Sequence, residues 1–164
     1  MNYCGLDTCD VLNGTGFRVS LFCSGCAKIP KCEFCQNRKA WNFNYGKPFT
    51  EETKNIIINA LSKPYIAGLS LLGGEVTDNL NDGIIFDLLK TVKEKFPEKT
   101  IWAWTGYKME ELNSINHKKF LSYLDVLIDG EYDYRQKNLN RAWANSKNQR
   151  IWEKKNDIWK VSER

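Results

Sequence analysis

The sequence predicts an α/β fold: an open, partial barrel of parallel strands with helices packed on it. Over most of the 164 residues, apolar segments with a period of two alternate with segments of helical period. Four such strand–helix units are too few to close an eight-stranded barrel, which typically needs about 250 residues. A chain of this length suits one core. We therefore expect a single domain over residues 1–164, in which 135–164 form a C-terminal basic and aromatic extension.

The first strands follow from local patterns. Residues 17–23 alternate in polarity as a strand does, and a cysteine-rich loop comes directly after them. Thr50 is a suitable N-cap, with acidic residues in the first turn, for a helix that ends near Leu61. The apolar run 66–72 then predicts a second strand, which ends at a Gly-Gly pair.

The later elements repeat this alternation. Apolar side chains recur at helical spacing from 84 to 92, and Pro97 closes that segment. Residues 101–105 predict a third strand, 109–123 a helix in one or two pieces, and 124–130 a fourth strand. Further on, we expect 150–152 and 158–160 to pair as a hairpin.

Polar or glycine-rich segments follow each of the four main strands. Parallel strands bring their C-terminal ends to one edge of the sheet, where the active sites of such folds lie. We therefore expect these segments to converge on one rim; they are the cysteine loop, Gly73-Gly74-Glu75, Gly106-Tyr107 and Asp129-Gly130.

The composition indicates a soluble globular protein, with 42% hydrophobic and 27% charged residues. No run approaches the ~20 apolar residues of a membrane span. The N-terminus lacks the basic stretch and apolar core of a signal peptide. We expect a cytoplasmic protein with no membrane partner.

Positive charge gathers towards the C-terminus. Residues 135–164 carry nine Lys/Arg against three Asp/Glu, together with three tryptophans. Such a segment can bind nucleic acid or an acidic protein surface, although charge runs are usually solvated faces. We expect no nucleic-acid partner. Because the strand–helix alternation is complete by Gly130, we expect residues from about 135 onward to contact a protein partner rather than build the core, through Arg141, Lys147 and Arg150.

The cysteines indicate metal or redox chemistry. Four of the six fall between residues 23 and 35, and a disulfide framework is not expected in the reducing cytosol. Two Cys-x-x-Cys pairs separated by five residues are cramped for zinc, whose pairs usually lie about 15–20 residues apart. Cys23 also falls within the strand pattern, where a buried thiol acts as a small apolar residue.

We therefore favour Cys26, Cys32 and Cys35 as ligands of a [4Fe-4S] cluster, with Cys23 structural. Three closely spaced thiolates suit a cubane cluster, and the fourth iron is left open for a substrate or cofactor. On spacing alone, a zinc site and ordinary buried cysteines remain alternatives. Cys23 also remains a candidate substitute for one of the three ligands.

Seven segments, in one order, carry a resemblance to a known family. They are 13–18, 21–26, 35–38 with Trp41, 73–75, 104–107, 125–130 and 146–149. From residue 1 to about 152, the chain resembles a family of small radical S-adenosylmethionine enzymes, the activating proteins of anaerobic (class III) ribonucleoside-triphosphate reductases. The usual cysteine pattern of this family is Cys-x3-Cys-x2-Cys, whereas this chain has five residues between Cys26 and Cys32.

The resemblance implies a partial parallel β/α barrel of the radical SAM type, a [4Fe-4S] cluster on the three cysteines, and S-adenosylmethionine bound to the open iron. One-electron cleavage of that cofactor would form a 5′-deoxyadenosyl radical, which takes a hydrogen atom from a glycine of the reductase. The implied partners are the large subunit of the anaerobic ribonucleotide reductase and a one-electron donor such as flavodoxin.

The resemblance also assigns cofactor-binding positions. Gly73, Gly74 and Glu75 match the segment that receives the methionyl amine, and Phe34 matches the position near the adenine. Physically, glycines at a strand end let the backbone approach a ligand, and Glu75 offers a carboxylate to an ammonium group. We therefore expect a Cβ at Gly74 to weaken cofactor binding and to spare the cluster.

Three other functions remain open on the sequence. The chain is alternatively an activase of a different glycyl-radical enzyme, or a small radical S-adenosylmethionine enzyme that acts on a small molecule. It is alternatively a non-catalytic zinc module that binds nucleic acid through its basic C-terminal segment.

Overall fold

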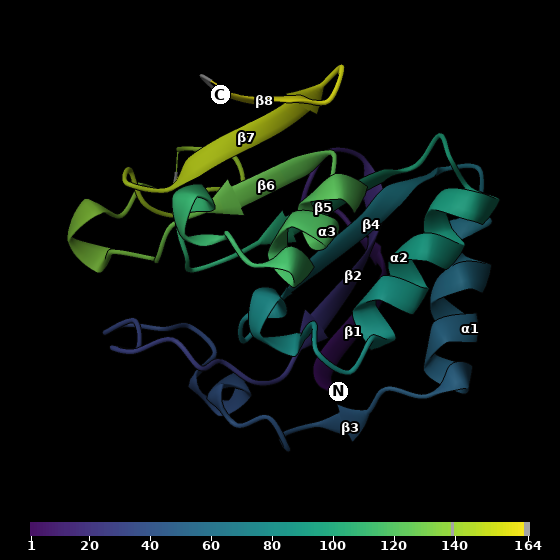
Figure 1. Ribbon diagram of the computed structural model, residues 1–164, viewed down its shortest axis with the longest axis horizontal. Coiled ribbons are helices and arrows are strands. Elements are labelled where there is room, and N and C mark those ends of the chain that lie inside the picture. The colour runs from purple at the N-terminus through teal and green to yellow at the C-terminus, as the bar shows by residue number, and fades with distance from the viewer. Residues whose placement is uncertain (139, 163–164) are drawn as a thin grey trace.

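A computed structural model describes residues 1–138 and 140–162. In this part of the chain, eight strands form one mixed sheet in the order β3-β1-β2-β4-β5-β6-β7-β8 (Figure 1). The strands are β1 (Asn2–Asp10), β2 (Phe17–Cys23), β3 (Lys47–Pro48), β4 (Ile66–Gly73), β5 (Thr100–Trp104), β6 (Val126–Asp129), β7 (Arg150–Lys155) and β8 (Ile158–Val161). The helices are α1 (Glu51–Leu61), α2 (Ile84–Lys95) and α3 (Ile115–Tyr123), with short 3₁₀ helices η1 (Arg38–Trp41), η2 (Val76–Asn79), η3 (Met109–Glu111) and η4 (Tyr134–Gln136).

The centre of the sheet is parallel, as the sequence predicts. Strands β2, β4, β5 and β6 are neighbours that run in one direction. The edges differ from the prediction of a wholly parallel sheet, because β1 and β3 on one side and β7 and β8 on the other pair antiparallel. The sheet is therefore open, as predicted, but mixed rather than parallel throughout.

The helices begin and end where the local signals place them. The Thr50 side chain accepts from the Thr53 backbone N–H in a capping box, and α1 ends at Leu61. Helix α2 stops at Lys95, two residues before Pro97. The predicted segment 109–123 is indeed split, into η3 and a separate α3 capped by Ser114.

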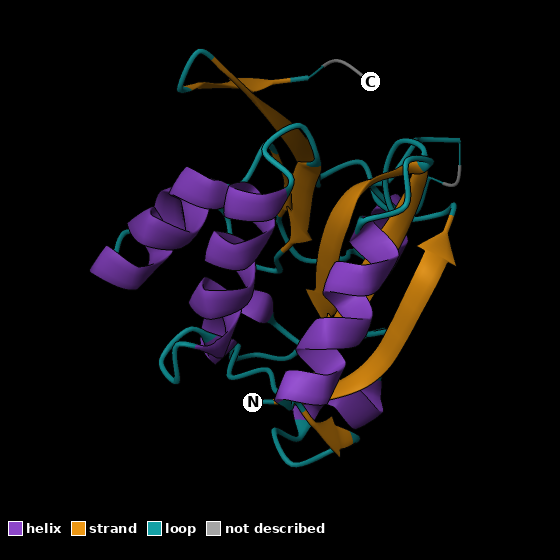
Figure 2. Ribbon diagram, turned by 90° about the vertical axis from the view of Figure 1, so that its right-hand side faces the viewer, coloured by secondary structure: helices purple, strands orange, loops and turns teal. Residues whose placement is uncertain are grey.

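The helices cover one face of the central sheet (Figure 2). Burial of alternate strand residues against them forms the main core, and this burial stabilises the fold by about 25 cal/mol for each Å² of apolar surface. That core includes Val19, Leu21, Leu69, Leu71, Ile101 and Leu127 from the strands and Ile57, Leu61, Ile85, Leu89 and Phe120 from the helices. No helix in the described ranges has the length and apolar character that crossing a bilayer requires.

A smaller apolar cluster lies on the other face of the sheet. Trp102, Val126 and Ile128 project there by the period-two alternation and pack with Ala144 and Ile151. Ala144 and Ile151 are fully buried, and β7 is hydrogen-bonded to β6.

The expectation that residues from about 135 onward lie outside the core is therefore wrong for β7. The hairpin itself is confirmed, since β7 and β8 pair across Asn156 and Asp157, which both adopt positive φ values as a tight hairpin turn requires. Leu139, Glu163 and Arg164, which belong to the same predicted extension, lie outside the described residues.

Candidate metal and cofactor site

The cysteine loop packs directly on the end of β4. The Gly74 backbone N–H donates to the carbonyl oxygen of Cys23 at 2.8 Å, and the Glu75 N–H donates to the carbonyl of Gly25 at 2.7 Å. The Gly25 N–H in turn donates to the carbonyl of Ala40 at 2.7 Å, which closes the base of the loop. The first two of the four predicted rim segments therefore meet.

The other two segments continue the same rim. The Gly106 N–H, just after β5, donates to Glu75 Oε2 at 2.7 Å. The Gly130 N–H, just after β6, donates to the carbonyl of Tyr107 at 2.9 Å. Hydrogen bonds thus join the C-terminal ends of β2, β4, β5 and β6, and the expected convergence on one edge is confirmed.

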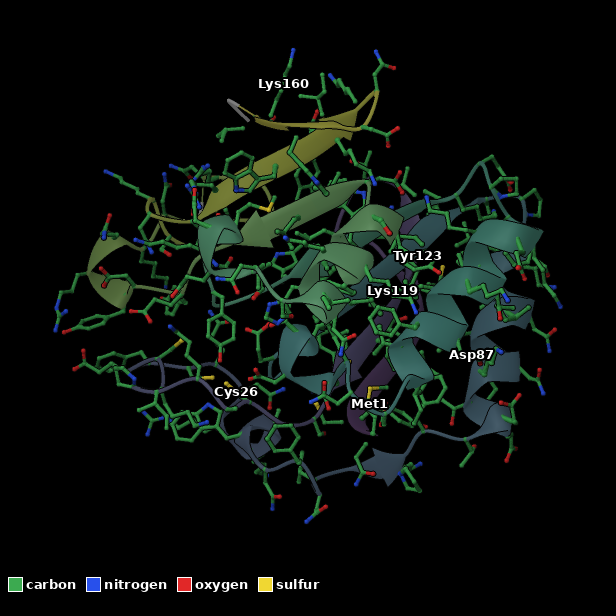
Figure 3. The ribbon with its side chains drawn as sticks, viewed as in Figure 1. Met1, Cys26, Asp87, Lys119, Tyr123 and Lys160 are labelled. Carbon is green, nitrogen blue, oxygen red and sulfur yellow. The ribbon has the colours of Figure 1, made fainter. Side chains whose placement is uncertain are left out.

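The structure separates Cys23 from the other three cysteines of the loop. Cys23 ends β2 and is fully buried in the main core, where burial raises the pKa of its thiol to about 12. Cys26, Cys32 and Cys35 are half-buried on the loop that follows (Figure 3 labels Cys26). A thiol that is hard to ionise is a poor metal ligand, so this arrangement favours a structural role for Cys23.

Burial also acts on the loop thiols. It raises the pKa of Cys26 and of Cys32. The backbone N–H of Lys28 and the charge of Lys31 act in the opposite direction on Cys26, and the charge of Lys28 does so on Cys32. Both thiols therefore have positive or donor groups near them that stabilise the thiolate form.

The donor set consists of three thiols on one loop. Cys26, Cys32 and Cys35 are half-buried, and no group of three His, Cys, Asp or Glu side chains among residues 1–138 and 140–162 lies close enough to hold a metal ion. In a [4Fe-4S] cluster each thiolate binds a different corner iron, so three cysteines from one short loop are the kind of donor set that such a cluster takes.

A cavity of about 540 Å³ opens beside the cysteine loop, on the sheet face opposite the helices. Cys32, Cys35 and Gly73 border it, and this volume lies in the usual range of small-molecule sites. The rest of its lining is mostly apolar or amide-bearing, namely Leu12, Asn13, Phe22, Gln36, Asn37, Leu72, Trp104, Tyr132, Trp143 and Asn145.

A buried guanidinium holds one wall of this cavity. Arg18 is fully buried, and burial lowers its pKa to about 10. Its Nε donates to Ser70 Oγ at 2.6 Å and its Nη1 donates to the carbonyl of Thr15 at 3.3 Å. Ser70 Oγ donates to the carbonyl of Asn13 at 2.6 Å, so the segment that carries Leu12 and Asn13 is fixed to the sheet.

Both glycines of the predicted segment are required by close backbone packing. Gly73 has a φ of +122°, and a Cβ there would lie 2.2 Å from the carbonyl oxygen of Cys23. A Cβ at Gly74 would lie 2.3 Å from the carbonyl oxygen of Gly25 and 2.5 Å from that of Ala40. These contacts argue against the expectation that a Cβ at Gly74 spares the cluster, because it would displace the base of the cysteine loop.

The Glu75 carboxylate faces inward. Its side chain is buried, and burial raises its pKa while hydrogen bonds from Gly106 and Thr77 oppose this. Oε1 accepts from the Thr77 N–H and hydroxyl, and Oε2 accepts from the Gly106 N–H. The carboxylate joins β4 to β5, so protein donors already contact both of the oxygens that are expected from the sequence to bind an ammonium group.

Phe34 lies at the tip of the cysteine loop and does not border the cavity. Its side chain is 47% exposed and its ring contacts that of Tyr134, with the centroids 4.0 Å apart. The adjacent Glu33 pairs with Arg135 at 3.1 Å. The loop tip is therefore held against η4, a contact between distant segments that no local pattern indicates.

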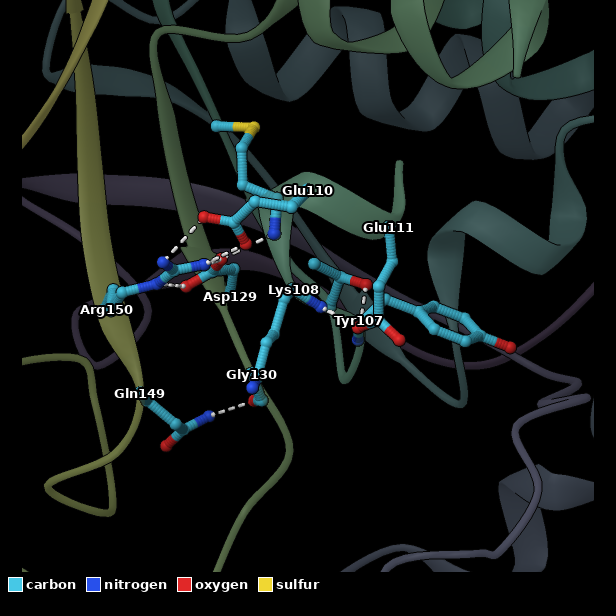
Figure 4. A network of polar contacts seen from close by, with 10 residues as sticks. Tyr107, Lys108, Glu110, Glu111, Asp129, Gly130, Gln149 and Arg150 are labelled. Carbon is cyan, nitrogen blue, oxygen red and sulfur yellow. Dashed lines mark hydrogen bonds and ion pairs between the residues drawn. The ribbon is translucent and has the colours of Figure 1, made fainter. Parts of the chain in front are cut away.

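The outer part of the rim is an ion-pair network (Figure 4). Arg150 Nε donates to Oδ1 of the fully buried Asp129 at 3.0 Å, and its Nη2 also donates to Asp129 Oδ2. The same guanidinium contacts both carboxylate oxygens of Glu110, at 2.8 and 2.7 Å, and holds the pKa of Glu110 at about 2. Gln149 Nε2 donates to the carbonyl of Gly130 at 3.1 Å.

Comparison with known proteins agrees with this geometry. Residues 12–152 match the family described as 4Fe-4S single cluster domain. The anaerobic ribonucleoside-triphosphate reductase-activating protein of Enterobacteria phage T4 is 44% identical over 162 residues, which are 98% of this chain and 99% of that protein. The proteins of the same name from Haemophilus influenzae and Escherichia coli K12 are 40% and 37% identical, over 92% and 91% of this chain and 97% and 96% of theirs.

The chain belongs to the family of anaerobic ribonucleoside-triphosphate reductase-activating proteins. From the sequence, we expect Arg150 to contact a protein partner. In this family member its guanidinium instead pairs with the buried carboxylate of Asp129, so it is not free for docking. Arg141 likewise donates to backbone carbonyls, among them that of Gln149 at 2.5 Å. Of the three predicted docking residues, Lys147 is the one whose side chain makes no hydrogen bond or ion pair in the contacts described for this chain of the family.

We expect Arg150→Ala to destabilise the protein by about 3 kcal/mol, because it leaves the Asp129 charge buried and unpaired. Urea unfolding of the variant measures this change. The double variant Arg150→Ala with Asp129→Asn removes both charges and should recover part of the loss. Equal stability of the single variant and the unmodified protein would contradict a structural role for the pair.

Proposed function

We propose that this chain is the activase of an anaerobic ribonucleotide reductase: it cleaves S-adenosylmethionine reductively and generates the glycyl radical on the large subunit of the reductase. The observation that carries the proposal is the group of three half-buried thiols, Cys26, Cys32 and Cys35, on one loop at the C-terminal rim of the parallel strands. The names of the relatives and the 4Fe-4S family match support it.

The three cysteines are proposed to hold a [4Fe-4S] cluster, which when bound would supply the electron for cleavage. Cys32 and Cys35 border the cavity that would receive S-adenosylmethionine. The apolar side chains of Leu72, Trp104 and Trp143 in its lining would keep water from the reactive centre.

The remaining cofactor contacts are proposed as follows. Gly73 and Gly74 present backbone to the methionyl end, since Gly73 borders the cavity. Glu75 acts by holding this segment in place through Gly106 and Thr77. Phe34 lies outside the cavity lining, so its proposed contact with the adenine requires that end of the cofactor to extend from the cavity towards the loop tip, where Tyr134 contacts the Phe34 ring.

Half-buried, unpaired thiols suit a reducing compartment, so we propose the cytoplasm as the site of action. A small one-electron donor protein, such as flavodoxin, is the proposed source of electrons.

Electron paramagnetic resonance of an anaerobic mixture tests the function. The mixture contains reconstituted protein, reductase large subunit, S-adenosylmethionine and dithionite. We expect a glycyl-radical signal on the large subunit and 5′-deoxyadenosine and methionine as products, with neither formed when S-adenosylmethionine is omitted. Cleavage without a radical on this subunit would favour a different glycyl-radical enzyme or a small-molecule substrate.

A further inference from the structure

The segment between Cys26 and Cys32 carries two lysines close to the proposed ligands. Lys31 is half-buried, its Nζ donates to the carbonyl oxygen of Cys26, and it lies 5.9 Å from the centre of the Trp41 ring. Both of these partners are uncharged. None of the ion pairs within the described ranges includes Lys31, so no carboxylate in contact offsets its charge.

Lys28 differs from Lys31 in this respect. Its Nζ lies 3.3 Å from Glu131 Oε2 and 5.2 Å from the centre of the Tyr107 ring. Glu131 acts on Cys32 with the opposite sign to Lys28. The charge of Lys28 is therefore paired with a carboxylate, whereas Lys31 has no ion-pair partner in the described residues.

The acidic groups near Cys26 lie on other segments. Asp78 Oδ2 accepts from the Ala27 N–H at 2.6 Å, and the buried Glu75 holds the end of β4. Both oppose Lys31 in their effect on the Cys26 thiol. At Cys26 the charge of Lys31 therefore opposes those of two carboxylates.

We propose that the positive charge of Lys31 raises the reduction potential of the cluster that Cys26, Cys32 and Cys35 hold. This role rests on the proposed function. Reduction adds one electron, and so one negative charge, to the site. A fixed ammonium group beside a ligand lowers the free energy of that more negative state. The potential of an iron–sulfur cluster depends on such charges, on hydrogen bonds and on solvent exposure.

A weaker one-electron donor, protein-bound flavin for example, then suffices to reduce the cluster. The half-burial of Lys31 strengthens the effect, because water screens a charge less when the side chain is not fully exposed. No bond forms or breaks in this step: one electron leaves the donor and enters the cluster.

Redox titration of the anaerobically reconstituted protein tests this role, with the reduced cluster followed by electron paramagnetic resonance. We expect Lys31→Gln to lower the equilibrium constant for one-electron reduction about tenfold, which is about 59 mV towards more negative potential. Lys31→Arg keeps the charge and should keep the potential. Glu131→Gln should shift the potential in the opposite direction, because it removes a negative charge near Cys32.

Lys160→Gln is the matched control. It also removes one lysine charge, but from β8, far from the labelled Cys26 (Figure 3), and should leave the potential unchanged. All variants are compared at equal iron and sulfide content per chain. If Lys31→Gln assembles no cluster, Lys31→Met is measured instead, with the same expected shift to more negative potential. Loss of the cluster in this second variant would overturn the proposal, because it would show that Lys31 is needed for folding of the loop.

An unchanged or raised potential in Lys31→Gln would also overturn it. Failure of the proposed cluster looks different in the same experiment, because the unmodified protein itself would then hold no [4Fe-4S] cluster and no variant would give a titration. Failure of the proposed reaction alone would leave the titration intact and would appear as a missing glycyl radical on the large subunit.

Discussion

Replacing Cys26, Cys32 or Cys35 singly by Ala is expected to abolish a stable [4Fe-4S] cluster and all cleavage of S-adenosylmethionine. Each thiolate holds a different corner iron, so two ligands leave the cluster open to loss. Iron and acid-labile sulfide content, visible absorption and formation of 5′-deoxyadenosine measure the result. The expected loss of activity is complete rather than partial.

Two other cysteines provide controls for this result. Cys9→Ala changes an exposed thiol on β1 and should retain cluster and activity. Cys23→Ala removes a thiol from the core and should retain at least part of the cluster. Loss of the cluster in the Cys23 variant, together with its retention in the Cys26 variant, would show that the proposed ligand set is wrong.

Gly74→Ala is expected to destabilise the protein by about 3 kcal/mol and to prevent cluster assembly. The new Cβ would lie 2.3 Å from a backbone oxygen of Gly25 and 2.5 Å from one of Ala40, and backbone on two sides cannot move away cheaply. The displaced segment leads directly into Cys26. Urea unfolding under reducing conditions gives the stability, and the iron content after reconstitution gives the effect on the site.

Gly83→Ala separates this steric effect from the general cost of replacing a glycine. Gly83 has a φ of +78°, but a Cβ there meets nothing within 4 Å. It should therefore cost only about 1 kcal/mol, from backbone conformation, and leave the iron content unchanged. Equal effects of the two substitutions would contradict the packing argument for Gly74.

Local signals in the sequence are sufficient for the middle of the fold. Thr50 caps α1, Pro97 follows the end of α2, and the two-residue alternation of 17–23 recurs as β2. Each of these features depends on neighbours within a few residues. Such features can be read directly from the chain.

The edges of the sheet depend on contacts between distant segments and were not predicted. β1 contains glycine, aspartates and two cysteines without a clear alternation, and it pairs antiparallel with β2 through two register shifts. The hairpin of β7 and β8 follows from its turn residues. Its addition to β6 does not, because that pairing depends on a buried Ile151 and on the contact of Arg150 with Asp129.

The candidate site divides in the same way. Cysteine spacing and the ends of parallel strands locate the loop and the rim. The inward direction of the Glu75 carboxylate and the contact of Phe34 with Tyr134 arise only when separate strands and loops come together. The charge of Lys31 is visible in the sequence, but its lack of an ion-pair partner in the described residues is a property of the fold.

Metal and sulfide analysis of the anaerobically purified protein tests the central claim most directly. The account predicts about four irons and four acid-labile sulfides per chain, the content of one [4Fe-4S] cluster, and no zinc. One zinc per chain with no acid-labile sulfide would contradict it, and would identify the cysteine loop as a zinc site instead.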